Sequence, residues 1–282
     1  MRIKLVHTQR VLAPTIMTLA GFTINPYRGC EFNCSYCYAK SIRIDNKNRD
    51  LLGVKINAPE ILEKELNYKK IDKVVLGSNC ECFTYAEIKF KLTEKILTIL
   101  NNNRVAYTIL TKSHLIGNYL PLIRQNKDNR IFFTFNFSRE KIRSFLEEKS
   151  PSLENRLAVL ERIKQSGIPL RIHIGPFIPY LSDLDEIFFR IKGLTREINI
   201  ELYHSKTGNF EEVLQKVKDY DYSIAGKIRT VYENRESYRD FSRRLRIQAL
   251  ALNKSYGFKI YFIVPEFDEF YDSRINYENP IF

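Results

Sequence analysis

The sequence predicts an α/β protein: a partial (β/α)6 barrel of the TIM type, followed by a C-terminal α+β extension. Two observations lead to this fold class. Short apolar runs of strand length alternate with amphipathic stretches, an order that favours parallel strands joined by helical crossovers. The 282 residues are 44% hydrophobic and 28% charged, which is a folded composition. Barrels of this kind commonly use about 250 residues as one domain.

Six apolar segments have the length and flanking residues of buried strands. The clearest is Lys73-Val74-Val75-Leu76-Gly77, which lies between Asp72 and Ser78. Helical patterns follow most of these segments, so the chain is expected to repeat a strand–helix unit about six times. The expected strands span residues 21–25, 73–77, 104–110, 130–137, 170–174 and 198–203.

The helices between these strands are predicted from apolar spacing and from capping residues. Residues 87–100 repeat apolar side chains at helical spacing, and a further helix is expected over 113–124. Ser152 begins a helix that stops at Gly167, and Asp183 begins another.

The strand–helix alternation ends near residue 205, which divides the chain into a barrel domain (1–205) and an extension (206–282). The extension is expected to form helices at 210–217 and 237–253 and a strand at 259–264. Arginine forks bind phosphates and exposed aromatic rings stack on bases, so the extension either contacts the substrate or caps the barrel. The plainer alternative is a solvated face above inward-packed rings. The residues concerned are Tyr232, Tyr238, Arg239, Phe241, Arg243 and Arg246.

Charge and composition restrict the class of protein. The formal net charge of +12 permits a polyanionic partner such as nucleic acid. No run of about 18 apolar residues forms a membrane span, and the N-terminal segment lacks the apolar core of a secretory signal. Five cysteines, an odd number in a long chain, argue against a disulfide scaffold and for a reducing compartment. We therefore expect a cytoplasmic protein.

The main chemical signal is the group Cys30, Cys34 and Cys37, spaced C-x3-C-x2-C directly after the first expected strand. Active sites of barrels lie at the carboxyl ends of the strands. Three thiolates on one short loop can hold three corners of a 4Fe–4S cluster and leave the fourth iron open, because such a cube normally takes four thiolates. A zinc site or a closed cluster, with Cys80 or Cys82 as fourth ligand, is the alternative.

The segment from Asn25-Pro26-Tyr27-Arg28-Gly29 through Cys37-Tyr38-Ala39 resembles the cluster motif of radical S-adenosylmethionine enzymes. More narrowly, it is similar to the spore photoproduct lyase-like branch of DNA repair enzymes. The resemblance implies that S-adenosylmethionine binds the open iron and that one electron, from a donor such as flavodoxin or ferredoxin, cleaves it to a 5′-deoxyadenosyl radical. That radical takes hydrogen from the substrate, and the barrel orients both cofactors.

Weaker matches follow in the order of the family, over about residues 21–190. They include 146–157, which resembles the family's LEPxAPSxxxRL stretch, and 167–183, which resembles its fifth strand and following loop. The resemblance implies that Tyr36 packs near the adenine and that Tyr38 relays the radical. It also implies an S-adenosylmethionine site built from Tyr36, Ser78, Lys112 and Thr134, although the family usually has serine where Thr134 stands.

One loop departs from the family pattern. After the second strand the family often has Thr-Asp-Pro-Tyr-Gln, whereas this chain has Cys80-Glu81-Cys82. True spore photoproduct lyases carry in this loop a cysteine that returns hydrogen to the product radical, so Cys80 or Cys82 is the candidate donor. Ligation of a second metal and packing as small apolar residues are the alternatives. Glu81 is either a substrate-binding residue or base, or a rim charge, and His173 is interpreted as a hydrogen-bonded core histidine.

These observations lead to three functional hypotheses. The favoured one is radical chemistry on a nucleic-acid lesion or modified base. The second is the same chemistry on a peptide or small metabolite, in which case the basic extension is ordinary surface. The third, from another class, is a metal-dependent nucleic-acid-binding protein without enzymatic activity.

Overall fold

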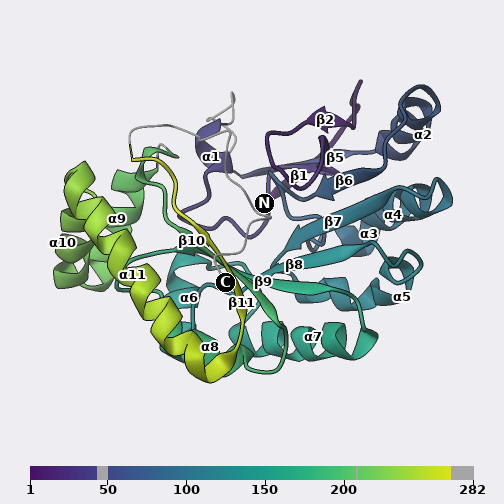
Figure 1. Ribbon diagram of the computed structural model, residues 1–282. Helices are drawn as coiled ribbons and strands as arrows, with labels where there is room; N and C mark the ends of the chain where they lie inside the picture. Colours follow the sequence, from purple (N-terminus) through teal and green to yellow (C-terminus); the bar gives the residue numbers. More distant parts are fainter. Residues whose placement is uncertain (43–49, 208, 268–282) are drawn as a thin grey trace.

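The protein is built around an eight-stranded sheet that curves into an open barrel (Figure 1). The computed structural model describes residues 1–42, 50–207 and 209–267. All neighbouring strands of this sheet pair in parallel except β2 and β3, which are antiparallel. This confirms the predicted class, a partial parallel barrel. In spatial order the strands are β11 (Lys259–Ile263), β10 (Glu197–Leu202), β9 (Leu170–Phe177), β8 (Arg130–Thr134), β7 (Ala106–Thr111), β6 (Lys73–Leu76), β3 (Phe22–Ile24) and β2 (Ala13–Pro14).

The helices lie around the outer side of the sheet, as α4, α5, α7 and α8 show in Figure 1. The main core fills the space between them and the outward side chains of the strands. In chain order the helices of the described residues are α1 (Ala39–Ile42), α2 (Ala58–Tyr68), α3 (Glu87–Phe90), α4 (Leu92–Asn102), η2 (His114–Asn118), α5 (Leu120–Ile123), α6 (Glu140–Leu146), α7 (Leu153–Ser166), α8 (Leu184–Ile191), η3 (Ser205–Thr207), α9 (Phe210–Tyr220), α10 (Tyr222–Val231) and α11 (Arg235–Tyr256).

The inward side chains of the sheet form a second, smaller core inside the barrel. Leu19, Val75 and Phe132 pack together there, apart from the main core. Because side chains alternate along a strand, the neighbours of Phe132 on β8 face the helices, whereas Thr134 shares its inward face. The barrel interior therefore has an apolar middle, with polar side chains towards both of its ends.

Two predicted helices differ from the structure. The segment 87–100 is broken at Lys91, whose φ of 52° is left-handed, because the Glu87 carboxylate accepts hydrogen bonds from the N–H groups of Thr93 and Glu94 and so starts α4. The segment 113–124 is a 3-10 turn followed by the short helix α5, since Pro121 lies in the first turn of a new helix. The caps at Ser152, Asp183 and Gly167 are confirmed.

A three-stranded sheet, which the sequence analysis did not predict, supports the start of the barrel. It consists of β1 (Arg2–Val6), β5 (Leu51–Lys55) and β4 (Tyr27–Arg28). β5 pairs in parallel with β1 and antiparallel with β4. β4 is followed directly by the cysteine loop, so this small sheet fixes where that loop leaves the barrel.

The segment after residue 205 folds onto the barrel. The predicted strand at 259–264 is β11, which adds a parallel strand beside β10. Tyr232 and Tyr238 are buried, so these rings pack inward, as in the plainer alternative. The division at residue 205 itself stays a prediction. No helix within the described ranges is long and apolar enough to cross a bilayer.

Candidate active site

The cysteine loop lies between β4 and α1, at the carboxyl ends of the barrel strands. Gly29 and Asn33 take left-handed φ values of 97° and 48°, which turn the chain sharply within the loop. The Cys37 N–H donates to the Cys34 carbonyl at 3.2 Å. Cys34 is buried, and Cys30 and Cys37 are half-buried. The turns therefore gather three thiols at the predicted end of the barrel.

The three thiols lie close enough to influence one another. Burial, followed by the neighbouring Cys34 and Cys37, raises the pKa of Cys30 well above its usual value. Burial raises the pKa of Cys34 to about 11. Without a metal Cys30 and Cys34 are thiols, and a positively charged centre is what stabilises neighbouring thiolates together.

The donor set fits an iron–sulfur cluster better than a single ion. Among the described residues, no three His, Cys, Asp or Glu side chains are grouped to hold a metal ion. A 4Fe–4S cube binds each thiolate through a different iron, so its ligands stand further apart than the ligands of one zinc ion. Cys80 and Cys82 interact with each other and with Tyr27 instead, so the candidate ligands are the three cysteines of the loop.

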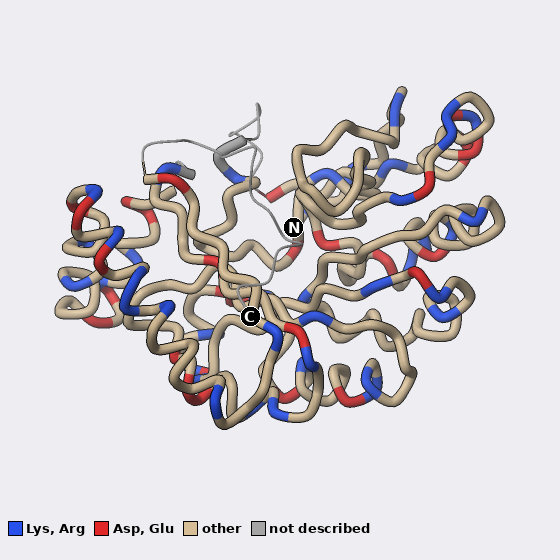
Figure 2. The backbone as a smooth tube through the Cα atoms, in the orientation of Figure 1, with Lys and Arg blue, Asp and Glu red and all other residues tan. Residues whose placement is uncertain are grey.

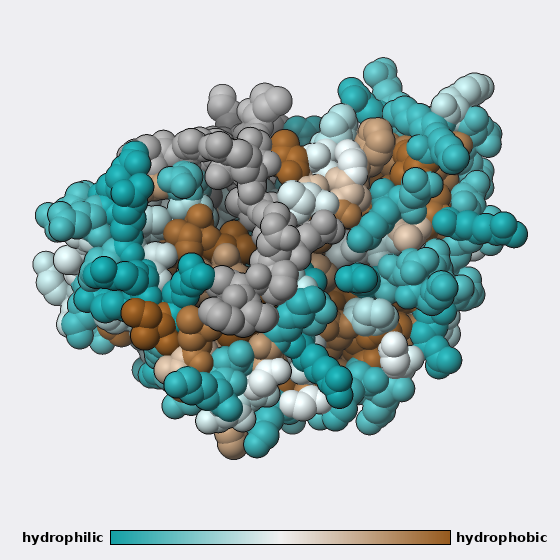
Figure 3. Space-filling model, in the orientation of Figure 1, coloured by the Kyte–Doolittle hydropathy of each residue, from teal (hydrophilic) through white to brown (hydrophobic). Residues whose placement is uncertain are grey.

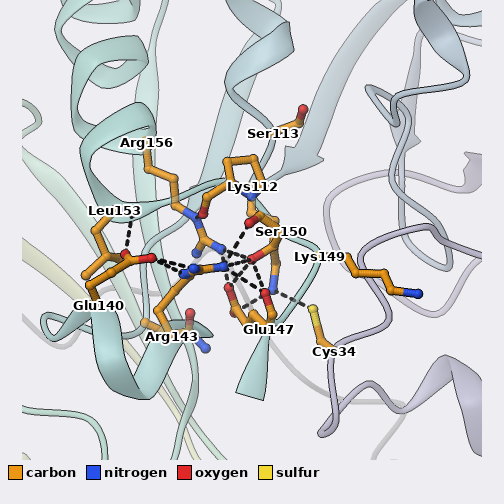
Figure 4. Close-up of polar contacts among 12 residues, drawn as sticks. Cys34, Lys112, Ser113, Glu140, Arg143, Glu147, Lys149, Ser150, Leu153 and Arg156 are labelled. Carbon is orange, nitrogen blue, oxygen red and sulfur yellow. Dashed lines mark hydrogen bonds and ion pairs between the residues drawn. The ribbon is translucent and has the colours of Figure 1, made fainter. Parts of the chain in front are cut away.

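Lys112, directly after β7, connects the cysteine loop to a buried carboxylate (Figure 4). Its Nζ lies 3.6 Å from Cys34 Sγ, 2.6 Å from Tyr36 Oη and 2.9 Å from Glu147 Oε1. Tyr36 also donates a hydrogen bond to Glu147, and Arg156 forms an ion pair with it. Two of the predicted cofactor residues, Tyr36 and Lys112, are thus brought together beside a motif cysteine.

One carboxylate, that of Glu147, is paired with two cations in this buried network. Glu147 and Arg156 are both fully buried. Burial alone raises the pKa of Glu147, but Arg156 and Lys112 reverse the effect and hold it well below its usual value. Burial lowers the pKa of Lys112, whereas Cys34 and Glu147 raise it, and the net shift is upward. Glu147 is therefore an anion and Lys112 a cation.

Residues 140–156 place Glu147 beside the cysteine loop. Arg143 donates to the carbonyls of Glu147 and Ser150 at 2.9 and 2.8 Å. The Ser35 N–H donates to the Leu146 carbonyl at 2.8 Å, which ties the cysteine loop to the end of α6. Sequence reasoning gave Glu147 and Arg156 no role, and the only available signal was two charged residues within a family-like stretch.

Tyr38 and Ser78 meet at another part of the rim. The Tyr38 hydroxyl donates to the Ser78 carbonyl and, at 3.1 Å, to Asn79 Oδ1. Ser78 Oγ lies 2.8 Å from Thr23 Oγ1 and accepts from Asn25 Nδ2 at 3.1 Å. These contacts hold the loop after β6 against the loop after β3, and they place both predicted residues at the carboxyl ends of the strands.

The two other cysteines differ in exposure. Cys82 is 0% exposed, and a Cβ on Gly77 would stand 3.3 Å from its Sγ. Cys80 is 8% exposed, and its Sγ donates to Asn25 Oδ1 at 3.5 Å. Since Asn25 also contacts Ser78, a chain of hydrogen bonds joins Cys80 to the Tyr38 region.

Glu81 is a structural anchor. Its carboxylate accepts hydrogen bonds from the Phe83 N–H at 3.0 Å, the Thr111 hydroxyl at 2.7 Å and the Lys112 N–H at 3.2 Å. Glu81 is also buried, which removes the rim-charge interpretation. It fixes the loop after β6 to the end of β7 and so positions Lys112.

Thr134 and His173 lie side by side on the inner face of β8 and β9, where they are paired in register. His173 Nε2 is 3.4 Å from Glu201 Oε2, whereas its Nδ1 has no hydrogen-bond partner and the residue is half-buried, so the expected hydrogen-bonded core histidine stays a prediction. Burial, followed by the charges of Lys112 and Arg171, lowers its pKa to about 4. A neutral histidine thus lies below the lysine, and Thr134 is half-buried beside it.

A parallel partial barrel with a three-cysteine loop and a lysine at the carboxyl ends of its strands is the architecture of radical S-adenosylmethionine enzymes. The model of the radical SAM superfamily matches residues 24–180, which is more than half of the chain. The chain belongs to this superfamily, and it is an enzyme of that class.

The chain is also similar to uncharacterized proteins of other organisms. An uncharacterized protein of Methanocaldococcus jannaschii is 28% identical over 223 residues, covering 78% of this chain and 85% of that protein. An uncharacterized protein of Mycobacterium bovis is 27% identical over 183 residues, 61% of this chain and 54% of its own length. The chain thus spans about half of the mycobacterial protein.

Two solved structures share the fold. Spore photoproduct lyase complexed with dinucleoside spore photoproduct has a TM-score of 0.67 at 14% identity, covering 92% of this chain and 82% of that one. Streptococcus suis SuiB bound to S-adenosylmethionine has a TM-score of 0.53 at 12% identity, covering 86% and 46%.

Proposed function

We propose that Cys30, Cys34 and Cys37 hold a 4Fe–4S cluster and that S-adenosylmethionine binds beside it. When bound, these cofactors supply one-electron cleavage of the sulfonium to a 5′-deoxyadenosyl radical that takes hydrogen from substrate. A small electron carrier such as flavodoxin or ferredoxin delivers the electron. The observation that carries this proposal is the contact of Lys112 with Cys34, Tyr36 and Glu147.

Lys112 has two tasks in this proposal. Its ammonium group donates towards the Cys34 sulfur, and it presents positive charge at the place where a carboxylate of S-adenosylmethionine would bind. Glu147 and Arg156 hold the lysine in place from the buried side. Tyr36, fixed by Lys112 and Glu147, offers its ring to the adenine, while Ser78 and Thr134 line the rim.

Cys80 is the better candidate for returning hydrogen to the product. It is more exposed than Cys82 and is linked through Asn25 and Ser78 to the loop that Tyr38 contacts. Tyr38 is therefore placed to relay the radical to or from this thiol. Cys82, enclosed behind Gly77, serves as the packing residue of the pair.

Anaerobic reconstitution with iron and sulfide tests the cofactor proposal. The wild-type protein should bind iron and sulfide and release 5′-deoxyadenosine under reducing conditions. Lys112→Met should keep the iron but weaken S-adenosylmethionine binding about 10- to 100-fold, the loss of a charge-assisted contact. A reconstituted, reduced protein that releases no 5′-deoxyadenosine contradicts the proposal.

The hydrogen-return step has its own matched pair of variants. Cys80→Ala should cleave S-adenosylmethionine normally but stall or misdirect the product, whereas Cys82→Ala should yield the normal product. Equal behaviour of Cys80→Ala and the wild type would refute the role of Cys80.

The substrate class we favour is a lesion or modified base in nucleic acid. The net charge of +12 and the dinucleoside photoproduct in the similar lyase structure support it. Figure 2 shows Lys and Arg positions spread along α11, although Arg243 and Arg244 are paired with Asp240. Binding of labelled DNA and RNA at rising salt checks this substrate class, because phosphate contacts give a steep salt slope. No binding at low salt favours the peptide or small-metabolite alternative.

A further inference from the structure

Asn25 lies where two loops of the candidate active site begin. It follows β3 directly and starts the segment that leads into the cysteine loop. β3 pairs in parallel with β6, and this pairing ends at Ile24 and Leu76. The chain that continues beyond β6 therefore begins beside Asn25.

The side-chain amide of Asn25 contacts three consecutive residues of the loop after β6. Its Oδ1 accepts a hydrogen bond from the Asn79 N–H at 2.9 Å and another from the Cys80 thiol at 3.5 Å. Its Nδ2 donates to Ser78 Oγ at 3.1 Å. A backbone N–H can only donate, so the Asn79 contact fixes which way round the amide lies. The amide oxygen therefore faces Cys80.

The loop after β6 turns sharply enough to bring Cys80 to this amide. Gly77 has a left-handed φ of 84°, and its N–H donates to the Ile24 carbonyl at 3.1 Å. A Cβ on Gly77 would stand 2.6 Å from the Leu110 carbonyl oxygen, so a larger residue does not fit without displacement. The backbone thus sets the position of Cys80, and Asn25 sets the direction of its S–H bond.

The backbone around Asn25 is anchored to the small sheet. The Asn25 carbonyl oxygen accepts a hydrogen bond from Lys55 Nζ at 2.8 Å. The Lys55 N–H donates to the Pro26 carbonyl at 3.4 Å. Lys55 is the last residue of β5, the middle strand of that sheet. Because both contacts use backbone oxygens of residues 25 and 26, they remain when the Asn25 side chain is replaced.

Opposing effects act on the protonation of the Cys80 thiol. A hydrogen bond from a neighbouring thiol, a backbone N–H and a cation lower its pKa, while burial and a carboxylate raise it, and the net shift is downward. The groups that lower the pKa are Cys82, the Tyr27 N–H and Lys55, and the carboxylate is Glu81. A thiolate has no hydrogen to return, so the downward shift opposes hydrogen return. An acceptor such as Asn25 Oδ1 stabilises the protonated form instead.

We propose that Asn25 is the positioning residue for Cys80 and holds it as a hydrogen-bonded thiol for hydrogen return. This inference rests on the proposed function, in which Cys80 is the hydrogen donor. In that step the S–H bond breaks and a C–H bond forms, so one hydrogen atom passes from Cys80 to the product radical and leaves a thiyl radical. Only the protonated form can supply this atom, which is why the contact between Asn25 and the S–H group matters.

Infrared spectroscopy of the full chain, reconstituted with its cluster, tests this proposal. The S–H stretching band lies apart from other protein bands and moves to lower frequency when the thiol donates a hydrogen bond. Difference spectra against Cys80→Ala and Cys82→Ala assign the bands of the two thiols. The wild type should show the Cys80 band at pH 7, at the frequency of a hydrogen-bonded thiol. A wild type without this band at pH 7 would overturn the proposal, because Cys80 would then be a thiolate.

Two substitutions of similar size should shift the Cys80 band in opposite directions. Asn25→Leu removes the acceptor, so the band should move to higher frequency. Asn25→Asp keeps an acceptor and adds negative charge, so the band should move to lower frequency and persist to a pH about one unit higher. Asn79→Ala removes an exposed amide of the same loop but keeps the N–H that Asn25 accepts, and should leave the band unchanged. An unchanged band in both Asn25 variants, or shifts in the same direction, would disprove the role of Asn25.

Release of 5′-deoxyadenosine by the same preparations separates this proposal from the proposed function. Release by a protein whose Cys80 band ignores both Asn25 variants contradicts the role of Asn25 alone. The expected band shifts without any release contradict the proposed radical chemistry, while the contact between Asn25 and the thiol is confirmed. If Asn25→Leu does not fold, Asn25→Asp decides, since a shift to lower frequency is expected only when the side chain at position 25 is the acceptor.

Discussion

The two ends of the barrel both carry buried charge, but they differ in how that charge is balanced. At the carboxyl end, the Glu147 carboxylate is contacted by Lys112, Arg156 and Tyr36, and Nη1 of Arg156 is buried without a hydrogen-bond partner. At the amino end, the Arg171 guanidinium is paired with Glu197, and the buried Thr108 hydroxyl has no hydrogen-bond partner. The carboxyl end is thus organised around one buried carboxylate, whereas the amino end places a buried hydroxyl near a buried guanidinium.

On the face of the molecule drawn in Figure 3, hydrophilic side chains cover most of the described surface, with smaller hydrophobic patches between them. Exposed apolar side chains scattered singly are normal for folded proteins. The difference between the ends therefore depends on buried groups, and substitutions there test it.

The largest expected effect belongs to the cysteine loop. Cys34→Ala should abolish iron incorporation and 5′-deoxyadenosine release, because two thiolates do not hold the cluster. Iron and sulfide analysis after anaerobic reconstitution measures this directly. Cys82→Ala, which removes a buried thiol outside the loop, should retain the iron. A Cys34→Ala protein with full iron content would rule out the assigned ligands.

Glu147→Ala should have the next largest effect, on stability. It leaves Arg156 buried without its partner, which costs about 3–5 kcal/mol. Urea unfolding gives the difference. Exposed Glu148 is the matched control, and Glu148→Ala should change stability by no more than about 0.5 kcal/mol. Equal stabilities of the two variants would mean that the ion pair between Arg156 and Glu147 does not stabilise the fold.

A pH effect should follow from His173, which lies between the two ends. Its pKa is about 4 in the folded chain against 6.5 ordinarily, so in this window the unfolded chain binds a proton that the folded chain excludes. The contribution of His173 to the free energy of unfolding is therefore fully present above about pH 6.5, and it is lost as the pH drops towards about 4. From about pH 7 to about pH 5 the loss is about 2 kcal/mol.

Urea unfolding of His173→Gln at both pH values checks this effect, since the variant should lose less stability than the wild type. Glu147 does not interfere, because its lowered pKa places its own contribution at more acidic pH, where stability is lost as the carboxylate is protonated. The same loss in both proteins would show that another group causes it.

The smallest expected effect concerns the buried Thr108 hydroxyl at the amino end of the barrel. Thr108→Val should stabilise the protein by about 1 kcal/mol, because it removes a buried hydroxyl without a hydrogen-bond partner. Thermal unfolding of the variant and the wild type measures this difference, and destabilisation would mean that the hydroxyl has a partner after all.

Much of the fold could be predicted because its signals are local. Apolar runs marked the strands of the barrel, and Ser152, Asp183 and Gly167 marked helix ends. The cysteine loop could be predicted for the same reason, since three thiols within eight residues are a local pattern. The small sheet of β1, β4 and β5 was missed because β1 is mostly exposed and because the three strands come together only through pairing of distant segments.

The sequence by itself determined the class of fold, the three cysteines and the likeness to radical S-adenosylmethionine enzymes, because each depends on residue types at short, fixed spacings. Only the tertiary structure decided that Glu147 and Arg156 support Lys112, that Glu81 is an anchor, and that four polar residues from four strands line one pocket. These properties depend on burial and on the distances between segments far apart in the chain. Local spacing does not encode either quantity, since both arise when the sheet curves and brings its strand ends together.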